Sequence, residues 1–379
     1  MAERKRRSIR QAVEELSWDL WILVPALGLV FFGIIMVYSA AAGQLDPDRV
    51  LYSQLGAMVV GVVAMFVLHR IDYHRFANPI VVYSFLILCI SLLSLVLLFP
   101  KIKGAKRWIV ISGHSVQPSE FAKLALILFL AWFLARRERE GKLEQFTLTF
   151  LPAAVILTLV GGLIYKEPDL GTLVVLMVIA ASMYVTAGAS LKKMLIFAPI
   201  ILAGLAQAIW FTPYRRTRIF AFLNPESKPL GSGYHILQSL IGIGSGGVNG
   251  LGFGKGRHKL AFLPEPTTDF IFPVIAEELG FVGAASLVLV LGLLVCRGLR
   301  AAFRAPDMVG RLLAIGITAW IGFQAFFNIS VVLQLLPTKG LTLPLISAGG
   351  TSLIVVLMGI GILLNISAQG DTHARQEAA

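Results

Sequence analysis

The chain contains a series of apolar stretches, each long enough to cross a lipid bilayer, and this feature constrains its fold more than any other. A spanning helix needs roughly 20 predominantly apolar residues. Ten stretches qualify by length and composition: 20–41, 51–68, 79–99, 119–135, 147–164, 170–187, 193–211, 270–296, 309–335 and 341–366. Only 14% of the residues are charged, whereas soluble domains carry about 25%. The sequence therefore predicts an all-α polytopic membrane protein with ten transmembrane helices.

These predicted helices divide the chain into three parts. Residues 1–19 form a basic N-terminal segment, residues 20–366 the membrane domain, and residues 367–379 a C-terminal tail. The first apolar stretch can span a bilayer and shows no clear small-residue cleavage site, so we interpret it as a transmembrane helix and not as a signal peptide. Residues 212–269 form one large loop between helices 7 and 8, and loops of that length are usually functional.

The distribution of Lys and Arg predicts the orientation. An even number of helices puts both termini on one side; with that side inside, the inner segments hold 18 Lys and Arg residues and the outer segments 14. Cytoplasmic loops usually carry the excess, so we expect both termini in the cytoplasm. Eleven of the fourteen outer cations fall in loops 100–118 and 212–269. Because this clustering opposes the usual bias, we expect these two loops to bind an anion.

Carboxylates enter an apolar run directly after the large loop. Asp269 lies at the mouth of the run, and Glu277 and Glu278 lie deeper in it. A charged side chain at membrane depth is costly, so such residues usually face a wet cavity or a partner and are functional candidates. We therefore predict that residues 255–280 form the active-site loop of a membrane enzyme, with Glu277 in a supporting or packing role.

Two basic groups in the outer loops are candidate ligands for an anion. They are Lys106 and Arg107 beside Trp108, and Arg215, Arg216 and Arg218. Arginine can bind phosphate as a bidentate donor, and the tryptophan could lie against a sugar or a lipid. The alternative, that these cations are ordinary surface charges, remains open at this point.

Polar residues at two predicted helix starts have both a structural and a functional interpretation. Ser119 is a plausible N-cap, and Glu120 and Lys123 share a helix face at i,i+3 spacing. Asp169 precedes the next helix, where a negative charge complements the helix dipole. Local salt bridging and capping explain these residues as well as a substrate site does. The sequence contains no P-loop, zinc motif, Ser-His-Asp arrangement or nucleic-acid-binding signature.

Seven motifs together carry a resemblance to a known family. They are Gly104 to Trp108, Gln117 to Lys123, Glu167 to Thr172, Tyr214 to Pro225, Leu263 to Phe270, Glu277 to Gly280, and Leu336 to Ser352. In order and spacing they resemble the SEDS proteins of shape, elongation, division and sporulation. The last motif resembles the division branch more than the elongation branch. The chain departs from the family pattern at Glu167, Thr267 and Ala348, where glutamine, histidine and an aromatic residue are usual.

The resemblance implies a ten-helix glycosyltransferase that polymerises lipid II into peptidoglycan strands at the outer face of the bacterial cytoplasmic membrane. It also implies a class B penicillin-binding protein and other divisome membrane proteins as partners. The family's essential aspartate falls on Asp269, which would act as general base on an acceptor sugar hydroxyl. A divalent cation, Mg²⁺ or Mn²⁺, on the departing prenyl pyrophosphate is a further option.

The full set of predicted site residues follows from these observations and the resemblance. Asp269 is the catalytic candidate; the substrate-binding candidates are Lys106, Arg107, Trp108, Glu120, Lys123, Arg215, Arg216, Arg218 and Lys339; the supporting candidates are Asp169, Glu265, Glu277 and Ser347. Two other functions remain possible: a flippase for the same lipid-linked precursor, and a non-catalytic scaffold of the divisome. A carrier would need coupling residues near the bilayer midplane, whereas these residues cluster at predicted outer helix ends.

Overall fold

The computed structural model describes most of the chain as helix. The described residues are 18–44, 46–102, 104–111, 114–190, 204, 207, 210–227, 231, 233–260, 263–337 and 340–378. Most of the predicted helix at 193–211, and the predicted substrate-binding residue Lys339, lie outside them.

Nine long helices form the body of the described structure. They are α2 (Leu20–Ala40), α3 (Pro47–His69), α4 (Pro79–Val96), α5 (Pro118–Arg139), α6 (Leu151–Lys166), α7 (Leu170–Thr186), α12 (Ile271–Arg304), α13 (Met308–Val332) and α14 (Gly350–Ala378). Among the described residues, eight helical segments are long and apolar enough to cross a membrane, and α7 is apolar but shorter. The prediction of a helical, multi-pass membrane protein is confirmed.

Short elements connect these helices. Two helices, α10 (Pro213–Leu223) and α11 (Tyr234–Ser245), lie in the predicted large loop. A two-stranded antiparallel hairpin, β1 (Ile109–Ile111) and β2 (His114–Val116), precedes α5. Single turns are η1 (Ala41–Gly43), η2 (Tyr73–Arg75), η3 (Phe146–Phe150), η4 (Pro225–Ser227) and η5 (His258–Leu260).

Helix starts follow local sequence rules at most positions. Asp46 and Asn78 cap α3 and α4 with side-chain oxygens, and a proline occupies the first helical position of each. The predicted N-cap at Ser119 is wrong. The helix begins one residue earlier, at Pro118, and Ser119 lies within its first turn, where its hydroxyl accepts a hydrogen bond from Gln117 Nε2.

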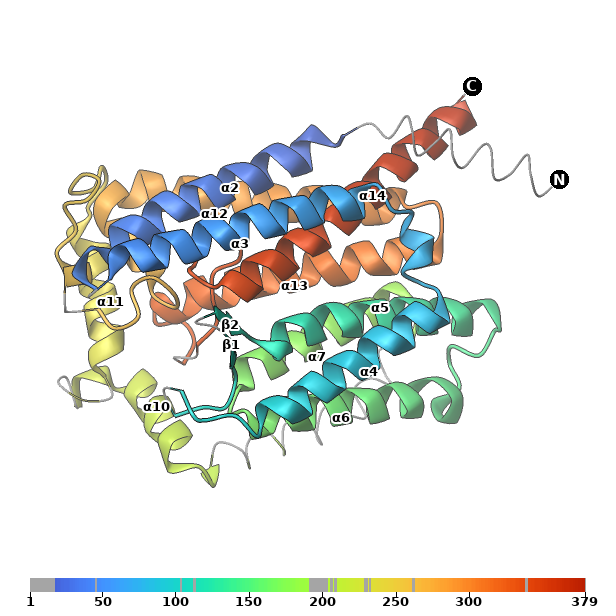
Figure 1. Ribbon diagram of the computed structural model, residues 1–379, viewed down its shortest axis with the longest axis horizontal. Helices are drawn as coiled ribbons and strands as arrows, with labels where there is room; N and C mark the ends of the chain where they lie inside the picture. Colours follow the sequence, from blue (N-terminus) through green and yellow to red (C-terminus); the bar gives the residue numbers. More distant parts are fainter. Residues whose placement is uncertain are drawn as a thin grey trace.

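The helices form two groups joined through α13 (Figure 1). The first group contains α2, α3, α12, α13 and α14, and the second contains α4, α5, α6 and α7. Helix α13 packs on α5 and α7 as well as on α12 and α14. In the most apolar windows of α5 and α14, 89% of the residues are buried, against 22% in α3. Helices α5 and α14 are therefore at the centre, and α3 presents most of its surface outward.

The last helix differs from its prediction. A helix was expected over 341–366, but α14 begins at Gly350, and the nine residues before it form a buried, irregular segment. Pro344 opposes helix formation in the residues before it, and Leu345 has a left-handed φ of 66°. We call residues 340–349 the strap. It lies at the end of the bundle that also carries α10 and α11, whereas α2 begins and α14 ends toward the other end (Figure 1).

The glycine-rich segment, residues 242–256, precedes η5 and packs directly on α12. Leu251 N donates to Glu277 O at 3.0 Å, and Gly252 N donates to Glu278 O at 3.0 Å. At Gly250, whose φ is 79°, an added Cβ would lie 2.2 Å from Glu278 O. Within α12, Gly280 has a non-helical φ of 68°. The segment packs against this position, where an added Cβ would lie 2.3 Å from Gly250 N. These glycines therefore allow the backbone of the segment to approach the backbone of α12 closely.

Candidate active site

Asp269 lies in the loop between η5 and the start of α12, and the strap holds this loop. Ser347 Oγ donates to Thr268 O at 2.6 Å, and Ala348 N donates to Thr267 O at 2.8 Å. Gly340 lies so close that an added Cβ would be 2.9 Å from Asp269 Oδ2. The Asp269 side chain remains partly exposed. The loop is therefore fixed through its backbone.

Four other charged residues act on the carboxyl group of Asp269. Burial raises its pKa most, and the negative charges of Glu265 and Asp169 add to this effect, whereas the positive charges of Arg107 and Arg218 lower it. The balance raises the pKa of Asp269 to about 7. A carboxylate with a pKa near neutrality suits general-base catalysis at physiological pH. The structure thus brings together one catalytic, two substrate-binding and two supporting candidates.

Arg107 is fixed by the backbone of the turn between α6 and α7. Its Nε donates to Glu167 O at 3.0 Å, and its Nη2 donates to Pro168 O. Asp169 caps α7, accepting from Thr172 N at 3.1 Å, so its predicted capping role is confirmed. Because the guanidinium group is anchored on two carbonyl oxygens, Arg107 presents a fixed positive charge beside Asp269.

The remaining basic candidates lie around this centre. Lys106 Nζ donates to Leu97 O at 2.6 Å, and Trp108 is partly exposed. On α10, Arg216 is exposed, while the guanidinium of Arg215 lies over the Tyr165 ring at 4.8 Å from its centroid. Arg218, on the same helix, lowers the pKa of Asp269.

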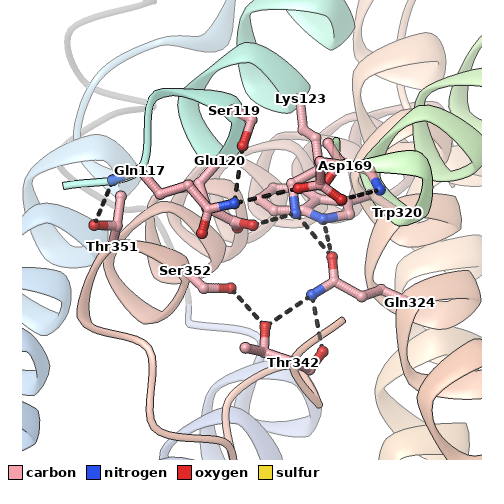
Figure 2. Close-up of polar contacts among 11 residues, drawn as sticks. Gln117, Ser119, Glu120, Lys123, Asp169, Trp320, Gln324, Thr342, Thr351 and Ser352 are labelled. Atoms are coloured by element: carbon pink, nitrogen blue, oxygen red, sulfur yellow. Dashed lines mark hydrogen bonds and ion pairs between the residues drawn. The ribbon is translucent and has the colours of Figure 1, made fainter. Parts of the chain in front are cut away.

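Glu120 and Lys123 form the predicted ion pair, but they are buried inside the protein. Lys123 Nζ lies 2.9 Å from Glu120 Oε1 and also donates to Gln324 Oε1 at 2.9 Å (Figure 2). The Lys123 ammonium further lies over the Trp320 ring at 4.9 Å. Lys123 is completely buried. In this conformation it contacts protein groups and is not open to a substrate.

Glu277 and its neighbour Glu278 are also buried, and both accept hydrogen bonds from residues 254–259. Glu277 Oε1 accepts from Arg257 N at 2.7 Å and lies 3.0 Å from His258 Nδ1. Glu278 accepts from Gly254 N at 3.0 Å, and also from Ser39 Oγ of α2 and Lys259 Nζ of η5. Both glutamates therefore fasten the segment before η5 to α12, which agrees with the supporting role expected for Glu277.

Glu167 is an unusual acid next to Arg107. Its side chain is fully buried, and neither carboxyl oxygen has a hydrogen-bond partner among the described residues. Burial, together with the nearby Asp169, raises the pKa of Glu167 to about 9, although Arg107 opposes the shift. At neutral pH the group is thus an uncharged acid, a close mimic of the glutamine that is usual at this position in the family.

Three residues that contact or influence the centre are absent from the predicted site. His235 on α11 lies against the Phe270 ring at 5.9 Å, and burial and the charge of Arg218 lower its pKa, although Glu265 opposes the shift. Asn328 and Gln324 on α13 hold the strap. Asn328 and Gln324 could have been recognised from the sequence, because amides within an apolar helix need hydrogen-bond partners. An unsatisfied polar group in the membrane is costly.

A metal site formed by the protein alone is not found in the described part of the chain. It contains no group of three or more His, Cys, Asp and Glu residues placed to hold a metal ion. The charged centre consists of carboxylates and arginines, a composition suited to a substrate that carries both a hydroxyl to be deprotonated and a phosphate.

The fold and the site define a polytopic helical membrane protein with a carboxylate and two arginines gathered at one end of its bundle. The chain belongs to the FtsW, RodA and SpoVE family of cell cycle proteins, which it matches over residues 16–372. It is 41% identical over 360 residues to stage V sporulation protein E of Bacillus subtilis, covering 93% of this chain and 97% of that protein. It is 42% identical over 364 residues to the probable peptidoglycan glycosyltransferase FtsW of Geobacter metallireducens, with 93% and 95% covered. The predicted family membership is confirmed.

Solved structures agree with this assignment. One chain, from a study of structural coordination of polymerization and crosslinking by a peptidoglycan synthase complex, matches with a TM-score of 0.77 and 32% identity, covering 94% of this chain and 99% of that one. The rod shape determining protein RodA of Thermus thermophilus matches with a TM-score of 0.67 and 30% identity, covering 93% and 98%. The described helices therefore have the arrangement of this family.

Proposed function

We propose that this chain is a peptidoglycan glycosyltransferase that polymerises lipid II into glycan strands during cell division. The family membership and the relatives named peptidoglycan glycosyltransferase support the reaction class. The main support comes from the arrangement at Asp269: burial raises the pKa of its carboxyl group to about 7, and the positive charges of Arg107 and Arg218 act on it.

The chemistry that this arrangement suits is sugar transfer with loss of a pyrophosphate. The Asp269 carboxylate takes the proton from the acceptor sugar hydroxyl as that oxygen bonds to the anomeric carbon of the donor. The bond from the anomeric carbon to the prenyl pyrophosphate breaks, and the pyrophosphate leaves with its electron pair. General-base assistance typically contributes about 10²–10⁴-fold to the rate.

The departing pyrophosphate needs positive charge, which Arg107 and Arg218 supply. Arginine stays protonated and its planar donors match phosphate oxygens. Arg107 is preorganised by its two carbonyl contacts, so it would not need to reorient as negative charge develops. Lys106, Trp108, Arg215, Arg216 and Lys339 remain predicted substrate contacts around this pair.

A divalent cation on the pyrophosphate remains a prediction. The described residues offer no three-ligand protein site, so the pyrophosphate oxygens would be its main ligands and nearby carboxylates could add to them. Mg²⁺ or Mn²⁺ would supply additional charge for the leaving group. The protein residues perform the proton transfer and the orientation of the substrate with or without it.

The topology that we propose contains ten transmembrane helices, with the segment around 193–211 as the seventh. The bacterial cytoplasmic membrane is the proposed location, with both termini in the cytoplasm and Asp269 at the outer face. The start of α2 and the end of α14 lie toward the end of the bundle opposite to α10 and α11, which supports placing them on opposite sides of the membrane (Figure 1).

The proposed partner is a class B penicillin-binding protein that crosslinks the new strands. The similarity to a chain from a peptidoglycan synthase complex supports such a pairing. Other divisome membrane proteins are further proposed partners. A lipid II flippase remains the second candidate, but the gathering of charged groups at one end of the bundle favours chemistry at that end over transport across the midplane.

The experiment compares Asp269→Asn with the wild-type chain in a lipid II polymerisation assay, with a cognate penicillin-binding protein that lacks its own transferase. The amide keeps the shape of the side chain but cannot accept the proton, so glycan strands should fall to background. Glu226→Gln, an exposed acid in the same large loop, is the matched control and should polymerise normally. Equal polymerisation by Asp269→Asn and the control would remove Asp269 from catalysis.

A further inference from the structure

Two amide side chains on α13 hold the strap from one side. Gln324 Nε2 donates to Thr342 O at 2.9 Å, and Asn328 Nδ2 donates to Leu341 O at 2.6 Å. The two amides are four residues apart, so they share one face of the helix. They therefore bind two successive carbonyl groups of the strap and fix its distance from α13.

Asn328 also reaches the catalytic loop. Its Nδ2 donates a second hydrogen bond, 3.0 Å long, to the backbone carbonyl of Asp269. An amide nitrogen has two protons, so both are used, one on the strap and one on the residue proposed as general base. Asn328 is thus a direct link between Leu341 and Asp269, and it is 3% exposed.

The orientation of Gln324 is fixed by groups that can only donate. Its Oε1 accepts from Lys123 Nζ at 2.9 Å and from Trp320 Nε1 at 2.8 Å (Figure 2). An ammonium and an indole N–H have no acceptor capacity, so the oxygen of Gln324 must face them and its nitrogen must face the strap. The Thr342 hydroxyl, 3.2 Å from Gln324 Nε2, also contacts Ser352 Oγ and extends the network to α14.

We propose that Gln324 and Asn328 are positioning residues for glycosyl transfer, which set the location of the Asp269 carboxylate by holding its backbone against the strap. The buried Glu120–Lys123 pair takes part by fixing the amide of Gln324. This proposal rests on the proposed function. Without these hydrogen bonds the Asp269 loop, which is not helical, loses its direct link to α13.

The first test measures lipid II polymerisation by Asn328→Ala with its matched control Thr318→Val. Thr318 is a buried residue of the same helix whose hydroxyl has no hydrogen-bond partner among the described residues. Displacement of a catalytic group by about 1 Å costs roughly 100-fold, so we expect kcat of Asn328→Ala to fall by about 10- to 100-fold. KM should change by less than about threefold, because binding groups such as Arg107 are not attached to Asn328.

A second readout separates positioning from general loss of stability. A displaced Asp269 carboxyl group becomes better solvated, so the acid limb of the kcat–pH profile should move to lower pH in Asn328→Ala and stay in place in Thr318→Val. Asn328→Ser, whose hydroxyl can donate to only one carbonyl at a time, should have an intermediate kcat. Should Asn328→Ala fail to fold, Asn328→Ser and Gln324→Ala carry the same comparison.

Hydrogen exchange tests the positioning without depending on the reaction. Amides of segment 263–270 and of the strap should exchange faster in Asn328→Ala and Gln324→Ala than in the wild type, and Thr318→Val should match the wild type. If wild-type protein forms no glycan strands but the exchange result holds, the proposed function fails and the structural coupling stands. Wild-type kcat, acid limb and exchange in Asn328→Ala would overturn the positioning proposal itself.

Discussion

Lys259 Nζ lies 2.6 Å from Glu278 Oε1, and both side chains are almost completely buried. Ser39 Oγ, from the end of α2, hydrogen-bonds to both of them. This contact joins three parts of the chain that are distant in sequence or structure: α2, η5 and α12. The ion pair is therefore a structural connection between them.

Removing one partner of this pair should be strongly destabilising, because the other charge would remain buried without compensation. Glu278→Gln and Lys259→Met should each cost about 3–5 kcal/mol. The double variant should lose less than the sum of the single losses, since the two groups interact directly. Thermal unfolding in detergent measures these effects, with Lys255→Met, an exposed lysine of the glycine-rich segment, as the control. Additive losses would show that the two groups act independently.

The glycine-rich segment should tolerate a methyl group only where it does not touch α12. At Gly250 an added Cβ would lie 2.2 Å from Glu278 O and the backbone is left-handed, so Gly250→Ala should cost more than about 2 kcal/mol through strain and displacement. At Gly244 nothing lies within 4 Å of the added Cβ, so Gly244→Ala should unfold at the wild-type temperature. Similar melting temperatures for the two variants would contradict this packing.

His74 should make stability depend on pH. It lies 2.7 Å from Asp72 and 2.9 Å from Asp307, and thereby connects the loop before α4 to the loop before α13. Hydrogen bonds to Asp307 and Asp72 raise the pKa of His74 to about 9. Its stabilising contribution is thus complete below pH about 6.5 and is lost as pH rises through about 9. The wild-type melting temperature should fall over this range.

The matched variant for this effect is His74→Gln. Its amide can keep one hydrogen bond but cannot carry the positive charge, so its melting temperature should be lower than that of the wild type at pH 6.5 and should change less up to pH 9. A pH profile for His74→Gln that parallels the wild-type profile would assign the dependence to another group.

The pH dependence of polymerisation should follow Asp269. As general base it must be deprotonated, so kcat should rise with pH through about 7, the value to which burial, Glu265 and Asp169 raise its pKa. Glu265→Gln removes a negative neighbour and should shift the rise to lower pH. Arg218→Met removes a positive neighbour and should shift it to higher pH. Shifts in the same direction for both variants would be inconsistent with this electrostatic centre.

The helical fold could be predicted from local information, whereas the choice of Asp269 as catalytic candidate depended on the family resemblance and stays a prediction. Long apolar stretches require helices in a membrane, and prolines after Asp46 and Asn78 mark helix starts. The pairing of Glu120 with Lys123 followed from i,i+3 spacing alone. The spacing did not predict that tertiary packing buries this pair, or that Lys123 hydrogen-bonds to Gln324.

The strap shows why the remainder was not predictable. Its apolar composition resembles the start of a spanning helix, yet hydrogen bonds from Gln324 and Asn328, and from Ser347 to the catalytic loop, stabilise an irregular conformation. Gln324 and Asn328 lie on α13, and Thr268, the partner of Ser347, lies 79 residues before it in the sequence. Local patterns therefore could not predict these contacts. Likewise, Glu277 and Glu278 could be recognised as carboxylates needing partners, but not as acceptors for a segment some 20 residues earlier.

Single-turnover glycan synthesis shows whether Asp269 is the base of a lipid II polymerase. The purified chain is combined with a transferase-free class B penicillin-binding protein and labelled lipid II, and Asp269→Asn is compared with Glu226→Gln at pH 8. We expect strands with Glu226→Gln and at least about 100-fold slower synthesis with Asp269→Asn, with both variants folded. Strand synthesis at the wild-type rate by folded Asp269→Asn would contradict this role of Asp269.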